Sequence, residues 1–251
     1  MEHFSFWQLS VLAGVGALAG FINILAGGGS FLTVPILIFM GMPATLANAT
    51  NRLGIFMQSL TGVGKFHSYG VFPLRFSILV TIPAVFGSVA GTWLATVVSD
   101  HAFKKYLAIF MVLMTLATFL KPGRMLQKRA IDYSPGRWAA IVAAFFGIGL
   151  YGGFIQAGVG FLILSAMLLT GYDFVAGNAT KTFTILIFTF VSLLIFMVKG
   201  MVQYAPGLAL GLGSMVGAVL GAKVTVQKGN VFIQRFVVVT VLLFAVLLFL
   251  R

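Results

Sequence analysis

The stretch Asn48-Ala49-Thr50-Asn51-Arg52 stands in an apolar part of the chain, and its first three residues recur 130 positions later in Asn178-Ala179-Thr180-Lys181. In both copies a basic residue follows the tripeptide, Arg52 in the first and Lys181 in the second. A charge inside an apolar membrane span costs about 2.5–3.5 kcal/mol on insertion scales. A chain that keeps two such cations is expected to use them, and an anion is the ligand that they favour.

The composition is that of an integral membrane protein. The chain has 251 residues, of which 60% are hydrophobic and 8% charged, and its mean hydropathy is +1.09. The net charge is +12, but the basic residues are scattered between apolar runs, as orientation signals in a membrane are. This pattern excludes a nucleic-acid-binding domain. Cysteine is absent, which excludes disulfides and thiolate chemistry.

Glycine, proline and charged clusters divide the chain into apolar segments. The second and seventh segments have about 11 to 13 residues, too few to cross about 30 Å of hydrocarbon at 1.5 Å per residue. They are expected to be half-helices or re-entrant pieces. The predicted segments are 6 to 26, 30 to 40, 44 to 64, 73 to 97, 103 to 120, 137 to 155, 158 to 170, 175 to 198, 204 to 222 and 231 to 250.

A second match supports an internal duplication. Gly87-Ser88-Val89-Ala90-Gly91 resembles Gly213-Ser214-Met215-Val216-Gly217, in the same order as the tripeptides and at nearly the same spacing. The predicted fold is an all-α polytopic membrane protein with two repeats of about five segments each and 8–10 spans, two of them short or broken. The predicted divisions are a first transmembrane repeat at 1–120, a basic cytoplasmic connection at 121–136 and a second transmembrane repeat at 137–251.

Basic residues predict the orientation of the spans. The positive-inside rule is satisfied if three connections face the cytoplasm, the one at 121–137, the one that Lys65 and Arg75 flank, and the one with Lys223, Lys228 and Arg235. Both termini would then lie outside. Five segments per half make the two repeats inverted, which we favour; four full crossings per half would instead make them parallel.

Polar residues follow the repeated tripeptides at helical spacing. Because residues i, i+3 and i+4 share one face of a helix, Asn48, Asn51 and Arg52 should lie together, and the second copy has the same pattern. The alternative is that the two cations extend to the membrane surface. The predicted substrate-binding residues are Arg52, Lys181, Asn48, Asn51, Asn178, Gln156, Gly28, Gly29, Ser30, Thr50, Thr180, Thr182 and Gly158.

Glycines interrupt both halves at corresponding places. Gly27-Gly28-Gly29-Ser30 ends the first long segment, and Gln156-Ala157-Gly158-Val159-Gly160 lies at the equivalent point. Consecutive N–H groups at the start of a half-helix can hold an anion. Close helix crossing is the alternative, and it is the favoured interpretation for four other pairs: Gly16 and Gly20, Gly87 and Gly91, Gly149 and Gly153, Gly213 and Gly217.

Acidic residues are few. Glu2, Asp100, Asp132 and Asp173 are the only four, and all lie at predicted termini or connections. No predicted span has a carboxylate for a proton relay or a sodium site, so Arg52 and Lys181 have no internal counter-ion. The three histidines are too dispersed for a metal site or a catalytic triad, and we expect no enzymatic activity, metal or cofactor.

The motifs resemble those of a known family. Leu25 to Pro35, followed by Gly41, Pro43 and the stretch 48–52, is similar to the signature of the TauE/SafE family of sulfite-exporter-like permeases, in the 4-toluene sulfonate uptake permease superfamily. The run from Gly158 to Lys181 is similar to its second motif. The resemblance implies an inner-membrane carrier of small sulfur-containing anions such as sulfite, sulfonates or sulfoacetate. Members of the family often have lysine where this chain has Arg52.

The resulting hypothesis is a secondary transporter that moves such anions across the bacterial inner membrane by alternating access, with one half moving against the other. A passive anion channel and a non-transporting membrane scaffold are the alternatives. The expected partners are a small anion, the lipid bilayer and, as a further alternative, a second copy of the chain in a homodimer. Nucleic acid is not an expected partner.

Overall fold

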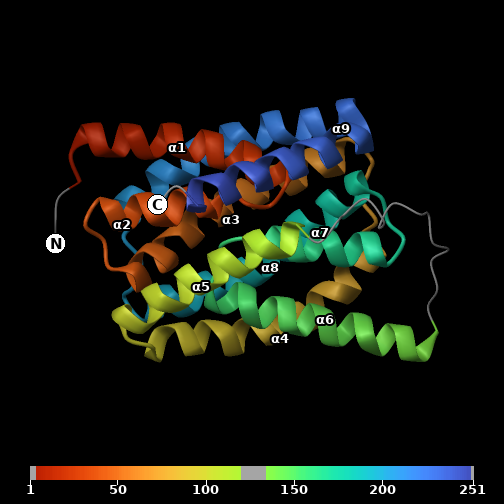
Figure 1. Cartoon of the computed structure of the whole chain (residues 1–251), viewed down its shortest axis with the longest axis horizontal. Coiled ribbons are helices and arrows are strands. Elements are labelled where there is room, and N and C mark those ends of the chain that lie inside the picture. Colours follow the sequence, from red (N-terminus) through yellow and green to blue (C-terminus); the bar gives the residue numbers. More distant parts are fainter. Residues whose placement is uncertain (1–3, 120–133, 250–251) are drawn as a thin grey trace.

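The computed structural model describes residues 4–119 and 134–249, and these form helices without strands (Figure 1). The last helix bends sharply at Gly229, whose φ is 68°. The helices are α1 (Phe6–Leu25), α2 (Ser30–Phe39), α3 (Ala44–Ser68), α4 (Leu74–Val97), α5 (Asp100–Phe119), α6 (Pro135–Phe154), α7 (Val159–Leu169), α8 (Phe174–Val198) and α9 (Tyr204–Phe249).

The all-α polytopic fold is confirmed. Five helices of the described residues are long and apolar enough to cross a membrane. The two segments predicted to be short are α2, with 10 residues, and α7, with 11. The ninth and tenth predicted segments are joined as the two arms of α9. Most of the predicted 121–136 connection lies outside the described residues.

The helices of the two predicted repeats correspond in length and order. α3 and α8 each have 25 residues and begin at Ala44 and Phe174, and α4 and α9 begin at Leu74 and Tyr204, so both pairs are offset by 130 positions. α1 and α6, with 20 residues each, run in opposite directions in Figure 1. These correspondences support an inverted duplication, which stays a prediction.

Glycines bring α1 against α9. A Cβ on Gly16 would lie 2.3 Å from the Leu210 carbonyl oxygen, and one on Gly20 would lie 2.5 Å from that of Ser214. Gly213 and Gly217 of α9 approach the backbone of α1 equally closely. Such spacing allows two helix backbones to touch in lipid. The close-packing interpretation of these glycines is confirmed.

α4 packs against α6 in the same way. A Cβ on Gly87 would lie 2.1 Å from the Phe146 oxygen, and one on Gly153 would lie 2.2 Å from the Ser88 oxygen. Gly91 and Gly149 make equivalent approaches across the same pair. Each glycine-packed pair therefore joins a helix of one predicted repeat to a helix of the other.

The two long helices α3 and α8 are buried along much of their length, and hydroxyl groups connect α8 to α4. Thr180 is paired with Ser77 at 2.9 Å and Thr184 with Thr81 at 2.9 Å. Thr50 of α3 accepts a hydrogen bond from the Gln203 N–H, just before α9. Thr50 and Thr180, both predicted to bind substrate, therefore connect helices.

The two ends of the molecule carry different connections. The α3–α4 connection, the start of α6 and the bend of α9 lie at one end, on the right of Figure 1, whereas α4 meets α5 at the other. The described parts of the connections predicted to be cytoplasmic therefore lie at the same end of the molecule. Large apolar side chains such as Phe86 and Trp93 of α4 are exposed, as lipid-facing side chains are.

Candidate functional site

The two helix interruptions touch each other. Gly27, with φ 97°, lies between α1 and α2, and Gly160 lies in the first turn of α7. A Cβ on Gly27 would lie 2.5 Å from the carbonyl carbon of Gly160, and a Cβ on Gly160 would lie 2.5 Å from the Cα of Gly27. No side chain fits at either position. The start of α2 and the start of α7 are therefore held together by backbone contact.

Aromatic rings pack beside this contact. Gly158, with φ 78°, lies against Phe31, because an added Cβ would be 2.5 Å from the tip of that ring. Phe31 and Phe161 stack with their ring centroids 6.3 Å apart. We call the contact between Gly27 and Gly160 the crossing. Its surroundings are buried and apolar on this side, and electrostatic interactions are strong in such an environment.

Backbone N–H groups at both helix starts lack acceptors. Within the described residues, no hydrogen bond is donated by the buried N–H groups of Gly28, Gly29 and Ser30 around the start of α2, or of Ala157, Gly158 and Gly160 around the start of α7. Buried N–H groups are nearly always paired. Unpaired donors at a helix N-terminus, where the helix dipole is positive, favour an anion.

Arg52 caps the end of α6. Its side chain is fully buried, and its terminal nitrogens donate to the carbonyl oxygens of Gly152 at 2.9 Å and Gly153 at 2.6 Å. A third hydrogen bond, 2.8 Å long, goes to Oε1 of Gln156 in the α6–α7 interruption. The ring of Phe196 lies 5.1 Å from the guanidinium carbon, a cation–π contact.

Lys181 caps the end of α1 in the same way. Its Nζ donates to the carbonyl oxygens of Asn23 and Ile24, both at 2.8 Å, and to Oδ1 of Asn178 at 2.5 Å. The side chain is 1% exposed. Extension of either cation to the membrane surface is wrong for this structure, because both charged groups end among buried carbonyls. The last turn of a helix has unpaired carbonyls and a negative dipole end, which a cation stabilises.

The repeated asparagines complete both caps. The Asn48 amide donates to the Phe154 oxygen at 3.1 Å, and the Asn178 amide donates to the Leu25 oxygen at 3.2 Å. In each case the asparagine comes from one predicted repeat and the carbonyl from the other. The recurring tripeptides therefore mark two caps that are exchanged between the repeats.

Other predicted residues hold α2 and α8 in place. Asn51 donates to Ser30 Oγ at 3.3 Å and accepts from Thr33 at 2.7 Å, which ties the start of α2 to α3. Thr182 donates to the Asn178 carbonyl one turn earlier. Gln156 donates to Thr189 at 3.1 Å. Gly28 and Gly29 are buried beside the crossing, and Gly29 packs against the Ala19 carbonyl.

Some polar groups of the interior were not predicted to be part of the site. The Asn23 side chain donates to Gln58 at 3.2 Å, which joins α1 to α3. Two buried side-chain atoms of the described residues have no hydrogen-bond partner, Arg52 Nε and Ser59 Oγ. Asn23 could have been found as an amide inside an apolar span, but the orphaned atoms depend on three-dimensional geometry that a sequence pattern does not contain.

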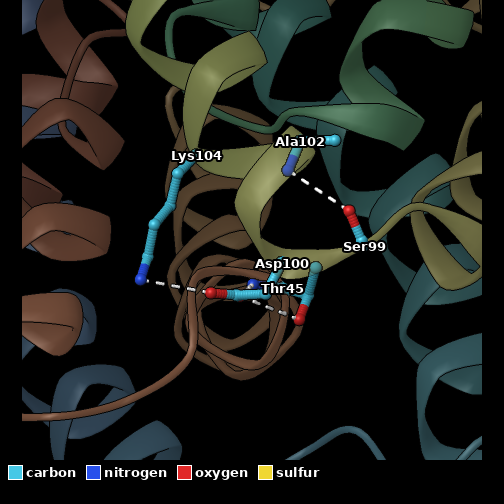
Figure 2. A network of polar contacts seen from close by, with 5 residues as sticks. All are labelled: Thr45, Ser99, Asp100, Ala102 and Lys104. Carbon is cyan, nitrogen blue, oxygen red and sulfur yellow. Dashed lines mark hydrogen bonds and ion pairs between the residues drawn. The ribbon is translucent and has the colours of Figure 1, made fainter.

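Asp100 lies outside this site, at the start of α5 (Figure 2). Its Oδ1 accepts from the backbone N–H of Thr45 at 3.0 Å and its Oδ2 forms an ion pair with Lys104 at 3.2 Å. Burial would raise the pKa of this carboxyl, but the hydrogen bonds and the charge of Lys104 outweigh burial and lower it. The corresponding contact at the start of α8 is made by Asn230, which accepts from Val175 at 3.2 Å.

Crossed half-helices at the centre of a bundle of apolar helices define the class of protein. Helices interrupted inside a membrane, with their polar ends turned inward, are how secondary transporters build substrate sites. The sequence model of the family described as Sulfite exporter TauE/SafE matches residues 12–248 of the chain. The chain belongs to this family; it is a multi-pass transporter of the bacterial inner membrane and not an enzyme.

Curated bacterial relatives are described as probable membrane transporter proteins. The chain is 30% identical over 234 residues to a "Probable membrane transporter protein" of Haemophilus influenzae, with 92% of this chain and 90% of the relative covered. It is also 30% identical to the "Probable membrane transporter protein YfcA" of Escherichia coli, with 92% and 86% covered. A Sinorhizobium relative, "Probable membrane transporter protein ORF9", is 26% identical, with 98% and 94% covered. No solved structure matches the chain.

Proposed function

We propose that the chain is a secondary transporter of small sulfur-containing anions, such as sulfite, sulfonates or sulfoacetate, and that the anion binds where the two helix interruptions cross. The supporting observation is the set of buried, unpaired N–H groups at the starts of α2 and α7. Both half-helix starts carry the positive end of a helix dipole, and the contact between Gly27 and Gly160 brings them together.

The surrounding charges favour the same class of ligand. Arg52 and Lys181 are buried within the bundle, and their hydrogen bonds to carbonyl oxygens neutralise the negative ends of α6 and α1. The positive ends of α2 and α7 have no such compensation. The carboxylates of the described residues, Asp100 and Asp173, lie at helix starts and are not buried. A negative ligand would therefore gain, and a cation would lose, at this crossing.

A compact oxyanion fits the donors. Sulfite and sulfonate groups present three oxygens, each able to accept more than one hydrogen bond, so several N–H groups can bind one small group. The name of the family, sulfite exporter, describes this chemistry for other members. Asn48, Asn51, Asn178 and Gln156 surround the crossing and hold its backbone in position.

Alternating access is best supported as a movement of the glycine-packed pairs. Because α1 packs on α9 and α4 packs on α6, each pair combines both sequence repeats. A separation of the two repeats would break both interfaces. We therefore propose that the α1–α9 pair moves relative to the α4–α6 pair around the crossing, and that the two sequence repeats do not move apart as separate halves.

The test is anion counterflow in proteoliposomes loaded with sulfite or sulfoacetate. The proposal expects saturable counterflow that Arg52→Gln reduces at least tenfold, whereas Arg75→Gln, at an exposed position, transports normally. Conductance without saturation or counterflow would indicate a passive channel. Absence of flux, together with no selective thermal stabilisation by a panel of sulfur oxyanions, would indicate a scaffold.

A further inference from the structure

The two buried cations differ in how many of their N–H donors form hydrogen bonds. An ammonium group has three N–H donors, and Lys181 has three acceptors within 2.8 Å, the carbonyls of Asn23 and Ile24 and the side chain of Asn178. Lys181 is therefore saturated in this structure. A ligand could bind its Nζ only by displacing one of the contacts that cap α1.

Arg52 has N–H donors that form no hydrogen bond within the part of the chain that the structure describes. A guanidinium has five N–H donors, and the three hydrogen bonds to Gln156, Gly152 and Gly153 all come from its terminal nitrogens. Its Nε is buried and has no partner among the described residues. An unpaired donor on a buried charged group is costly, and a ligand that accepts from it would remove that cost.

The free donor lies at the α6–α7 interruption. The guanidinium is fixed there by Gln156, two residues before Gly158, whose own N–H is among the unpaired groups. Phe196 lies near the guanidinium, 5.1 Å from its central carbon. This interruption therefore combines a positive half-helix end, unpaired backbone donors and a charged side-chain donor without a partner.

We propose that the two cations have separate roles, and this rests on the function proposed above. Arg52 contacts the transported anion through its Nε–H, together with the N–H groups at the start of α7. Lys181 is a positioning residue that caps α1 and does not touch the anion. The site is therefore asymmetric although the repeats resemble each other.

Arg52→Lys separates capping from binding. Lysine keeps the charge and has three N–H donors on one nitrogen, whereas Arg52 reaches Gly152, Gly153 and Gln156 from two terminal nitrogens, and lysine has no Nε–H at this place. We expect the variant to unfold within a few degrees of the wild type and its Kd for sulfite to rise at least tenfold. Lys181→Met should instead lower the unfolding temperature and leave the Kd of the folded fraction within threefold.

The binding assay is titration of the purified protein in lipid nanodiscs with sulfite, and wild-type NMR of ¹⁵N-labelled arginine gives a readout that needs no variant. The buried Nε–H of Arg52 should exchange slowly with water, unlike that of exposed Arg75, and its resonance should shift with sulfite. An unmoved resonance, or a wild-type Kd in Arg52→Lys, would overturn the division of roles while the proposed function stands. A wild-type protein that binds none of sulfite, sulfoacetate and sulfate would overturn both.

Discussion

The backbones of Gly27 and Gly160 are in direct contact, because a Cβ on either residue would lie 2.5 Å from the backbone of the other. They belong to different predicted repeats and are the point at which the two interrupted helix pairs meet. The contact fixes the distance between the starts of α2 and α7, and with it the spacing of the N–H donors that we assign to the anion.

Gly27→Ala and Gly160→Ala are expected to prevent this approach. Gly27→Ala adds strain at a positive φ, about 1–2 kcal/mol, to the steric conflict, and both variants should lose transport and unfold at lower temperature. Gly70→Ala is the matched control, since Gly70 has φ 68° but nothing within 4 Å of an added Cβ. Equal transport by Gly27→Ala and Gly70→Ala would show that the backbone contact is not required.

Gly16→Ala should destabilise the α1–α9 pair. An alanine in a helix interior is usually favourable by about 0.5–1 kcal/mol relative to glycine, but the new methyl group would lie 2.3 Å from the Leu210 oxygen. Overpacking of this kind costs about 1–3 kcal/mol. Gly14→Ala, two residues away with nothing within 4 Å, should be neutral or stabilising in thermal unfolding. A stabilised Gly16→Ala variant would contradict the packing.

Asn178→Leu should weaken the cap of α1. The substitution removes the donor to the Leu25 carbonyl and an acceptor of Lys181, and buried polar groups left unpaired cost about 1–3 kcal/mol each. Thr182→Val, on the same helix, removes only a bond to the carbonyl one turn earlier and serves as the control. Thermal unfolding in nanodiscs measures both, and equal stability of the two variants would count against a capping role.

Asp100→Asn should change stability in a pH-dependent way. The folded carboxyl has a lowered pKa, so its charge contributes fully above the ordinary aspartate value of 3.8, and that contribution is lost as the pH falls through the lower folded-state pKa. Wild type should therefore be slightly more stable than Asp100→Asn near neutral pH, with the difference shrinking below about pH 4. The loss is expected to be small because asparagine can still accept from Thr45, as Asn230 accepts from Val175. A stability difference between wild type and Asp100→Asn that grows as the pH falls would contradict the lowered pKa.

The predicted orientation can be tested on a background without cysteine. Ser68, the last residue of α3, and Ser99, between α4 and α5, are both exposed. An impermeant maleimide added to spheroplasts should label Ser99→Cys at once and Ser68→Cys only after permeabilisation, because Lys65 and Arg75 favour the cytoplasm. Labelling of Ser68→Cys alone would reverse the orientation.

The sequence predicted the features that depend on local composition. Apolar length predicted that α2 and α7 are too short to cross a membrane, and small residues four apart predicted the close helix packing of Gly16 and Gly20, although not its partner α9. It could not predict which groups pair with Arg52 and Lys181. Their main acceptors are backbone carbonyls, which every residue has, so no residue pattern reveals them. The cations were expected to have no internal counter-ion, and in the described residues their hydrogen bonds go to backbone carbonyls and amide side chains, not to carboxylates.

The exchange of caps also bears on how the chain is made. The carbonyls at the end of α1 are capped by Lys181, which lies 158 positions after Asn23 in the chain. At a translation rate of about 5–20 residues per second, the ribosome reaches Lys181 roughly 10–30 s after Asn23. During that interval the open end of α1 needs water or the insertion machinery to solvate it, so maturation of the first interruption waits for the synthesis of α8.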